Sequence, residues 1–158
     1  MNKILLFIIS VVICQLAGVV GSFFTFNSVK TWYLTINKPV FNPPSWVFGP
    51  VWTILFLLMG ISLFLVWSKG FDNPQVKIAL LIFAAQLILN VLWSTLFFGL
   101  KSPLFAFVEI VILWIFILLT IINFYSISKP ASYLLIPYLL WVTFASVLNF
   151  AIFLLNRA

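Results

Sequence analysis

The side chains that most enzymes use for acid–base, nucleophilic or metal chemistry are scarce in this chain. It has no histidine, a single cysteine, Cys14, and only two acidic residues, Asp72 and Glu109. This inventory cannot supply a serine triad, a pair of catalytic carboxylates or the ligands of a metal site. A haem would also lack its usual proximal histidine. We therefore expect no catalytic residue, no metal and no required cofactor.

Two apolar segments instead combine aromatic rings with amide groups at spacings of three or four residues. The first segment carries Gln86, Asn90, Trp93 and Phe97, and the second carries Tyr138, Trp141, Ala145 and Asn149. Such spacing puts each set on one face of a helix. Aromatic walls with a few polar groups suit a flat, mostly apolar ligand, such as a metal-free tetrapyrrole. Asn90 and Asn149 have an alternative role, because amide side chains also join membrane helices by hydrogen bonds.

The composition places these helix faces in a membrane. The chain is 65% hydrophobic and 6% charged, and its mean hydropathy is +1.30. Apolar runs of about 20 residues, long enough to cross a ~30 Å hydrocarbon core, occur at 4–26, 46–67, 76–98, 104–125 and 132–154. We predict an all-α integral membrane bundle of five transmembrane helices, forming a single domain over residues 1–158.

Several residues mark the expected helix boundaries. Asn73 and Ser102 each precede a proline, which predicts N-caps for the third and fourth helices. Ser45 is the corresponding candidate for the second helix. Pro137 lies early enough in the fifth that a kink is compatible with an intact span.

The first apolar run resembles a signal peptide at its start, but it continues to Phe26, which favours a transmembrane helix. Cys14, Gly18 and Ser22 recur every four residues in it, a pattern that lets membrane helices approach closely. This small-residue face could serve the bundle or a dimer.

The segment at 27–45, between the first two helices, is rich in proline and tryptophan. Lys38-Pro39 and Asn42-Pro43-Pro44 fix a rigid, non-helical path, so the loop can hold its shape over a site. Trp52, Asn90, Trp93, Glu109 and Asn149 all lie within about 12 Å of the helix ends that meet this loop. We expect them to converge beneath it. Glu109 either pairs with Lys101 or takes part in gating or ligand capture.

The positive charges divide evenly between the two ends of the helices, so the positive-inside rule leaves the orientation open. The formal charge of +6 indicates contact with lipid headgroups rather than with nucleic acid.

Three separated motifs together resemble the tryptophan-rich sensory protein family, also called the translocator protein or peripheral benzodiazepine receptor family. They are W-Y-x-x-x-x-K-P-x-F-x-P-P-x-W-V-F-G-P-V-W from Trp32, Q-L-I-L-N-V-L-W with F-F-G, and L-I-P-Y-L-L-W-V-T-F-A-S-V-L-N-F ending at Phe150. The resemblance implies a five-helix bundle, usually a homodimer, whose loop after the first helix closes a pocket. That pocket binds porphyrins and synthetic isoquinoline- or benzodiazepine-type ligands, and cholesterol in animal members.

The resemblance also implies roles for individual residues. The expected ligand contacts are Trp52, Asn90, Trp93, Phe97, Tyr138, Trp141, Ala145, Leu148 and Asn149, and the expected residues of the closing loop are Tyr33, Pro43, Pro44 and Trp46. Phe41 stands where relatives commonly have tryptophan, and the sterol motif of animal members is missing. The resemblance therefore favours porphyrin over cholesterol. The short chain, without a targeting extension, suggests the cytoplasmic membrane of a bacterium.

Three classes of function follow from these expectations. The first is a receptor or sensor that binds tetrapyrroles and similar planar amphiphiles in tetrapyrrole or stress homeostasis. The second is a transporter of tetrapyrroles or lipids, although few intramembrane charges are present to couple an ion gradient. The third is a light-dependent porphyrin-degrading enzyme, in which the pigment and oxidisable tryptophans would supply the chemistry.

Overall fold

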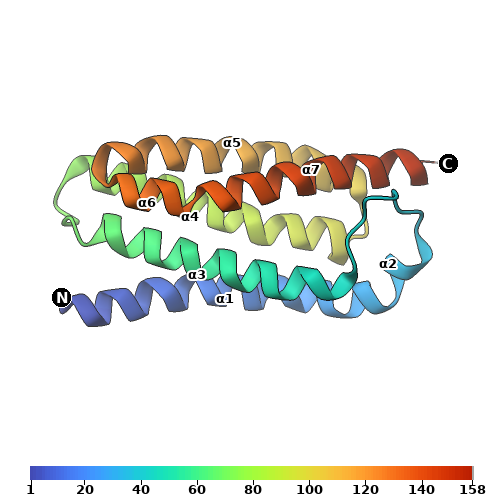
Figure 1. Cartoon of the computed structure of the whole chain (residues 1–158), viewed down its shortest axis with the longest axis horizontal. Helices are drawn as coiled ribbons and strands as arrows, with labels where there is room; N and C mark the ends of the chain where they lie inside the picture. Colours follow the sequence, from blue (N-terminus) through green and yellow to red (C-terminus); the bar gives the residue numbers. More distant parts are fainter. Residues whose placement is uncertain (158) are drawn as a thin grey trace.

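The computed structural model describes residues 1–157, and within them the only regular secondary structure is helical. The helices are α1 (Lys3–Lys30), α2 (Trp32–Thr35), α3 (Phe48–Trp67), α4 (Pro74–Ser94), α5 (Pro103–Ile127), α6 (Lys129–Leu134) and α7 (Ile136–Asn156). A 3₁₀ turn, Ser45–Val47, precedes α3, and a π-helical turn, Thr95–Gly99, continues α4. The five segments that are long and apolar enough to cross a membrane run side by side (Figure 1). The predicted all-α membrane bundle is confirmed.

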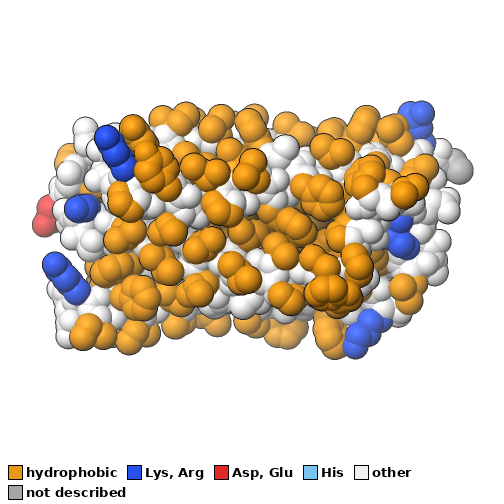
Figure 2. All heavy atoms as spheres, viewed as in Figure 1, with side chains coloured by type: hydrophobic (Ala, Val, Ile, Leu, Met, Phe, Trp, Pro, Cys, Tyr) orange, Lys and Arg blue, Asp and Glu red, His pale blue; other side chains and the backbone are white. Residues whose placement is uncertain are grey.

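The surface of the bundle agrees with a place in the bilayer. Apolar side chains cover the visible face along most of its length, and lysine and arginine gather near its two ends (Figure 2). The N-terminus lies at one end, and α2, its loop and the end of α7 lie at the other (Figure 1). We call the second end the lid end, and residues 31–44 the lid loop. The lid loop is shorter than the expected 27–45, because α1 continues to Lys30.

Two of the three predicted helix caps are confirmed. Asn73 Oδ1 accepts a hydrogen bond from the Gln75 amide at 2.9 Å, and Ser102 Oγ accepts one from the Phe105 amide at 3.4 Å. The prediction for Ser45 is wrong, since its side chain caps no helix. The chain has already turned at that point, because the Val47 amide donates to the Pro44 carbonyl at 3.0 Å.

The fifth span is irregular near Pro137 but remains one segment over Lys129–Asn156, which agrees with the predicted kink in an intact span. Helix α6 ends at Leu134, Leu135 adopts φ −90° and ψ −10°, and α7 begins at Ile136. Proline has no amide hydrogen and its ring displaces the carbonyl one turn earlier, which interrupts the ladder there. Helix α6 is held in place by Ser62 Oγ, which donates to the Ala131 carbonyl at 2.7 Å.

Glycines allow α1 and α3 to pack in close contact near the middle of the two helices. A Cβ atom on Gly60 would lie 2.7 Å from Val11 Cα, and one on Gly18 would lie 2.7 Å from Phe56 Cδ2. At Gly60 the opposing atom belongs to the backbone, so only glycine permits the approach, whereas at Gly18 the Phe56 ring would have to move. The small-residue face of the first helix therefore packs inside the bundle at Gly18.

Candidate functional site

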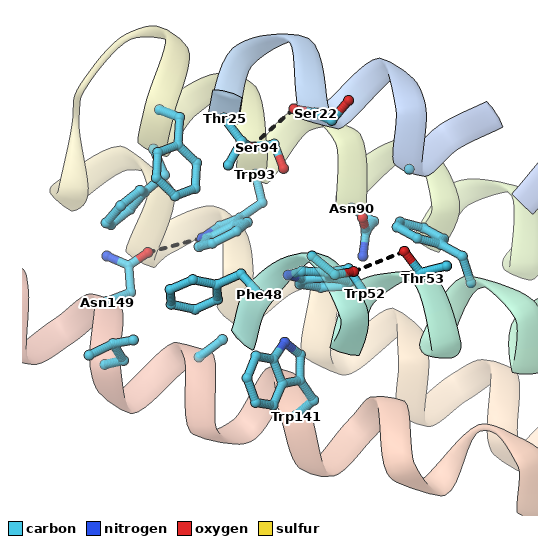
Figure 3. Close-up of a pocket in the computed structure, with 18 of the residues that line it drawn as sticks. Ser22, Thr25, Phe48, Trp52, Thr53, Asn90, Trp93, Ser94, Trp141 and Asn149 are labelled. Atoms are coloured by element: carbon cyan, nitrogen blue, oxygen red, sulfur yellow. Dashed lines mark hydrogen bonds between the residues drawn. The ribbon is translucent and has the colours of Figure 1, made fainter. Parts of the chain in front are cut away.

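A cavity of about 290 Å³ lies toward the lid end of the bundle. Side chains from α1, α3, α4 and α7 converge on it, with Trp52, Trp93 and Trp141 as its largest walls (Figure 3). Its lining includes these expected ligand contacts: Trp52, Asn90, Trp93, Phe97, Trp141, Ala145, Leu148 and Asn149. Of the expected loop residues, Tyr33 also lines it. Among the described residues, no charged side chain does so.

Aromatic packing fixes the shape of the walls. Trp93 and Phe97 are stacked with ring centroids 5.4 Å apart and planes 24° apart. Phe48 meets Trp141 edge to face at 6.2 Å. The π-helical turn that follows α4 brings Phe97 and Phe98 together into the interior, and Ser28 Oγ donates to the Phe98 carbonyl at 2.7 Å. Carbonyl groups in the last turn of a helix lack intrahelical partners, and Ser28 of α1 supplies one here.

Hydrogen bonds join the helices around the cavity. Trp93 Nε1 donates to Asn149 Oδ1 at 3.0 Å, and Asn149 Nδ2 donates to the Pro103 carbonyl at 2.7 Å. One amide side chain thus links α4, α5 and α7. Asn149 has the helix-joining role that the sequence left open, and it also lines the cavity.

Tyr138 lies behind the wall rather than on it. Asn90 Nδ2 donates to Tyr138 Oη at 2.8 Å, and Tyr138 Oη donates to Gln86 Oε1 at 2.9 Å. The tyrosine is fully buried, and its ring packs edge to face on Trp52 at 6.3 Å. Its place differs from the expected direct ligand contact, because its hydroxyl is used to position Asn90.

Trp141 carries a hydrogen-bond donor that has no partner among the described residues, and its ring lines the cavity. Its Nε1 atom is buried, and no acceptor for it exists within residues 1–157. Figure 3 shows the indole nitrogen on the side of Trp141 that faces Trp52. An unpaired N–H in such a place is costly unless a ligand or water accepts its hydrogen bond.

The lid loop is held down mainly by Tyr33. This residue is 2% exposed, and its hydroxyl donates to Asn42 Oδ1. Burial raises the pKa of Tyr33 to about 12. Lys38 Nζ donates to the Tyr33 and Ile36 carbonyls at 2.6 and 3.0 Å.

The other expected loop residues lie away from the cavity. Trp46 is 76% exposed, and neither Pro43 nor Pro44 is part of the lining. The prolines fix the course of the loop. The exposed indole lies at the lid end, where amphipathic rings favour the membrane interface.

A reciprocal pair of amides fastens the lid loop to the end of α7. The Asn37 amide donates to Asn156 Oδ1 at 2.9 Å, and Asn156 Nδ2 donates to the Asn37 carbonyl at 2.8 Å. These residues are 119 positions apart in the chain. No sequence pattern indicated this pairing.

Glu109 is buried in α5 at 5% exposure, and neither carboxyl oxygen has a hydrogen-bond partner among residues 1–157. The expected pairing with Lys101 is therefore wrong. Glu109 points into the helical interface with Ala106 and Ile110, whereas Lys101 lies in the exposed turn before α5, at φ +54°. Glu109 is not part of the cavity lining.

The sequence interpretation missed the contribution of α1. Gln15, Gly18, Gly21, Ser22 and Thr25 all line the cavity. Their small and polar side chains indicated only close helix packing. Their spacing of three or four residues was the available signal, since it puts them on one face.

Fold and site together define a polytopic membrane protein with an uncharged, tryptophan-walled cavity near one end of its helices. Residues 10–155 match the TspO/MBR family, and the chain belongs to that family.

The chain is 50% identical to the tryptophan-rich protein TspO of Chlorobaculum tepidum over 157 residues, which are 99% of each chain. It is 52% identical to the protein of the same name from Archaeoglobus fulgidus over 155 residues, covering 98% of this chain and 99% of the relative. The translocator protein of Bos taurus is 34% identical over 138 residues, covering 86% of this chain and 81% of the relative. The resemblance drawn from the motifs is confirmed. The protein is an integral membrane protein, and its prokaryotic relatives agree with the predicted cytoplasmic membrane.

Proposed function

We propose that this protein is a membrane receptor or sensor that binds metal-free tetrapyrroles, and similar planar amphiphiles, in the tryptophan-walled cavity. The observation that carries the proposal is the buried Trp141 N–H, unpaired within residues 1–157, beside an uncharged aromatic cavity. A flat ring system would stack on the indoles, and an uncharged acceptor on it, such as a pyrrole nitrogen or a carbonyl oxygen, would accept from Trp141.

The volume of the cavity bears on how such a ligand would sit. About 290 Å³ is close to the lower end of the range for small-molecule sites, roughly 300–1,000 Å³. The cavity would therefore enclose part of a tetrapyrrole and leave the remainder outside the walls. Carboxylate groups would stay outside, because burying an unpaired charge among uncharged side chains is unfavourable.

Binding rather than catalysis is the function that the residues support. The described residues contain no cluster of histidine, cysteine or acidic side chains that could hold a metal. The cavity lining contains no group that titrates near neutrality for proton transfer. We propose that porphyrin is not turned over in the dark, and that the receptor acts as a homodimer.

The test uses the protein in lipid nanodiscs and a metal-free dicarboxylic porphyrin. We expect saturable binding with a Kd in the micromolar range, about −8 kcal/mol. Trp141→Phe should weaken it several-fold, because the ring is kept but the donor is lost. Trp114→Phe is the matched control, since the Trp114 N–H already donates to Thr143 at 2.8 Å outside the cavity lining. Equal affinity in both variants would contradict the proposed contact.

A further inference from the structure

The cavity extends to the outer surface of the bundle between α1 and α3. Val19 and Ser22 on α1, and Gly49 and Thr53 on α3, line the cavity and are also exposed on the outside. They belong to spanning segments, so the surface on which they are exposed faces lipid. In Figure 3, Ser22 and Thr53 lie on the α1 and α3 sides of the cavity.

The packing of these two helices explains why the gap lies at this level. Near mid-helix they are in contact at Gly60 and Gly18, where an added Cβ would clash at 2.7 Å. Gln15 Nε2 then bridges to the Thr53 carbonyl at 3.1 Å. Beyond this bridge, toward the lid end, a Cβ on Gly49 would meet no described atom within 4 Å. Gly49 lines the cavity, and no described side chain fills the space beside it.

The lid loop covers the end of the cavity that faces water, and hydrogen bonds hold this loop in place. Tyr33 is buried and donates a hydrogen bond to Asn42, and Lys38 donates hydrogen bonds to two carbonyl groups of the lid loop. The Asn37–Asn156 pair holds that loop to α7. Entry from water would require several of these contacts to break together, whereas entry between α1 and α3 requires none of them to break.

The edges of the gap are polar. The Ser22 hydroxyl donates to the Val19 carbonyl at 2.6 Å, and the Thr53 hydroxyl donates to the Gly49 carbonyl at 2.9 Å. Each hydroxyl oxygen still has lone pairs for a passing donor. Thr53 lies about 8 Å from the start of α3, so these hydroxyl groups are near the lid end of the spans.

We propose that the cavity receives its ligand laterally from the bilayer through the gap between α1 and α3, with the lid loop closed. The ligand class is thereby restricted to planar molecules that are already dissolved in the membrane. This inference deepens the proposed function, and it rests on that function only for the identity of the ligand.

A labelling experiment tests the route without porphyrin. Ala145 lines the cavity and is 8% exposed, so Ala145→Cys in a Cys14→Ala background places a thiol inside it. In nanodiscs we expect N-octylmaleimide, which partitions into lipid, to label this thiol at least tenfold faster than a sulfonated maleimide. Adding Val19→Trp should slow the octyl reagent at least tenfold. Val20→Trp is the matched control, because Val20 is outside the lining and is 45% exposed, against 50% for Val19.

Gly49→Phe blocks the same gap from α3 and covers the case in which Val19→Trp does not fold. Faster labelling by the sulfonated reagent, no labelling by the octyl reagent, or equal rates in the Val19 and Val20 variants would overturn the proposal.

Porphyrin exchange in nanodiscs, followed by porphyrin emission, separates this inference from the proposed function. Val19→Trp should slow both association and dissociation of porphyrin. A second variant carries Asn37→Cys and Asn156→Cys in the Cys14→Ala background, and a short bifunctional reagent links its two thiols. This cross-link should change neither rate. Exchange stopped by that cross-link would refute lateral entry while the receptor function stands. A protein that labels as expected but binds no porphyrin would refute the receptor function and leave lateral entry supported.

Discussion

Trp93 Nε1 donates a hydrogen bond to Asn149 Oδ1 at 3.0 Å, and this bond ties the α4 wall of the cavity to α7. The same amide reaches the Pro103 carbonyl at the start of α5. Because the bilayer cannot satisfy the Trp93 N–H, the packing of three helices depends on this one side chain.

Asn149→Leu should lower both stability and affinity. It leaves the Trp93 N–H unpaired, at a cost of about 1–3 kcal/mol, removes a second hydrogen bond to the Pro103 carbonyl, and frees Trp93 to rotate away from the ligand. The thermal midpoint in mild detergent and the porphyrin Kd measure the two effects. Asn123→Leu is the control, because Asn123 Nδ2 bonds only within its own helix, to the Leu119 carbonyl. Similar losses in both variants would argue against the special role of Asn149.

Stability should fall at alkaline pH partly because of Tyr33. Its folded-state pKa of about 12 lies above its ordinary value of 10.0. The unfolded chain therefore loses this proton first, so the stabilisation is complete below pH 10 and is lost as pH rises toward 12. The loss is at most about 2–3 kcal/mol. Tyr33→Phe should remove this part of the pH dependence. An unchanged alkaline profile in that variant would show that another group is responsible.

The close contact of α1 and α3 predicts opposite outcomes for two glycine substitutions. Gly60→Ala forces a Cβ to 2.7 Å from Val11 Cα, a backbone atom that cannot move alone, and should destabilise by about 1–3 kcal/mol. Gly49→Ala meets open space among the described residues and should be neutral or stabilising by up to about 1 kcal/mol. Chemical or thermal unfolding in detergent compares them. Equal destabilisation would contradict the open space described beside Gly49.

Removal of the Glu109 carboxyl should not harm the protein. The group is buried and has no partner within residues 1–157, so no favourable contact is lost in Glu109→Gln. Burying a charge without a partner is unfavourable in a membrane. We expect an equal or higher thermal midpoint and unchanged porphyrin affinity. Asp72→Asn, in the exposed turn before α4, is the control. A clear drop in the midpoint for Glu109→Gln alone would mean that the carboxyl has an essential contact.

The sequence predicted the spans because hydropathy and helix length are local properties. Asn73 and Ser102 were recognised as caps for the same reason, since each acts on an amide two or three residues away. The helical spacing of Asn90, Trp93, Trp141 and Asn149 also predicted which faces turn inward, because polar groups avoid lipid.

The other features of the site could not be predicted from the sequence, because they depend on contacts between residues far apart in the chain. Asn37 and Asn156 are 119 residues apart, and neither lies in a distinctive pattern. Tyr138 shares a helix face with Trp141, but only the position of Gln86 across the interface shows that its hydroxyl is already used. The sequence assigned Ser22 only to close helix packing and gave Thr53 no role, and only the structure shows that both line the cavity.

The most direct test of the receptor function is the porphyrin Kd of Ala145→Phe in nanodiscs, compared with the parent and with Val147→Phe. Ala145 lines the cavity, whereas Val147, on the same helix, is 57% exposed and outside the lining. A phenyl ring at position 145 fills the space between the tryptophan walls. We predict that Ala145→Phe folds normally and binds at least tenfold more weakly, while Val147→Phe binds as the parent does. Parent-like affinity in a well-folded Ala145→Phe protein would place the ligand elsewhere and contradict the account.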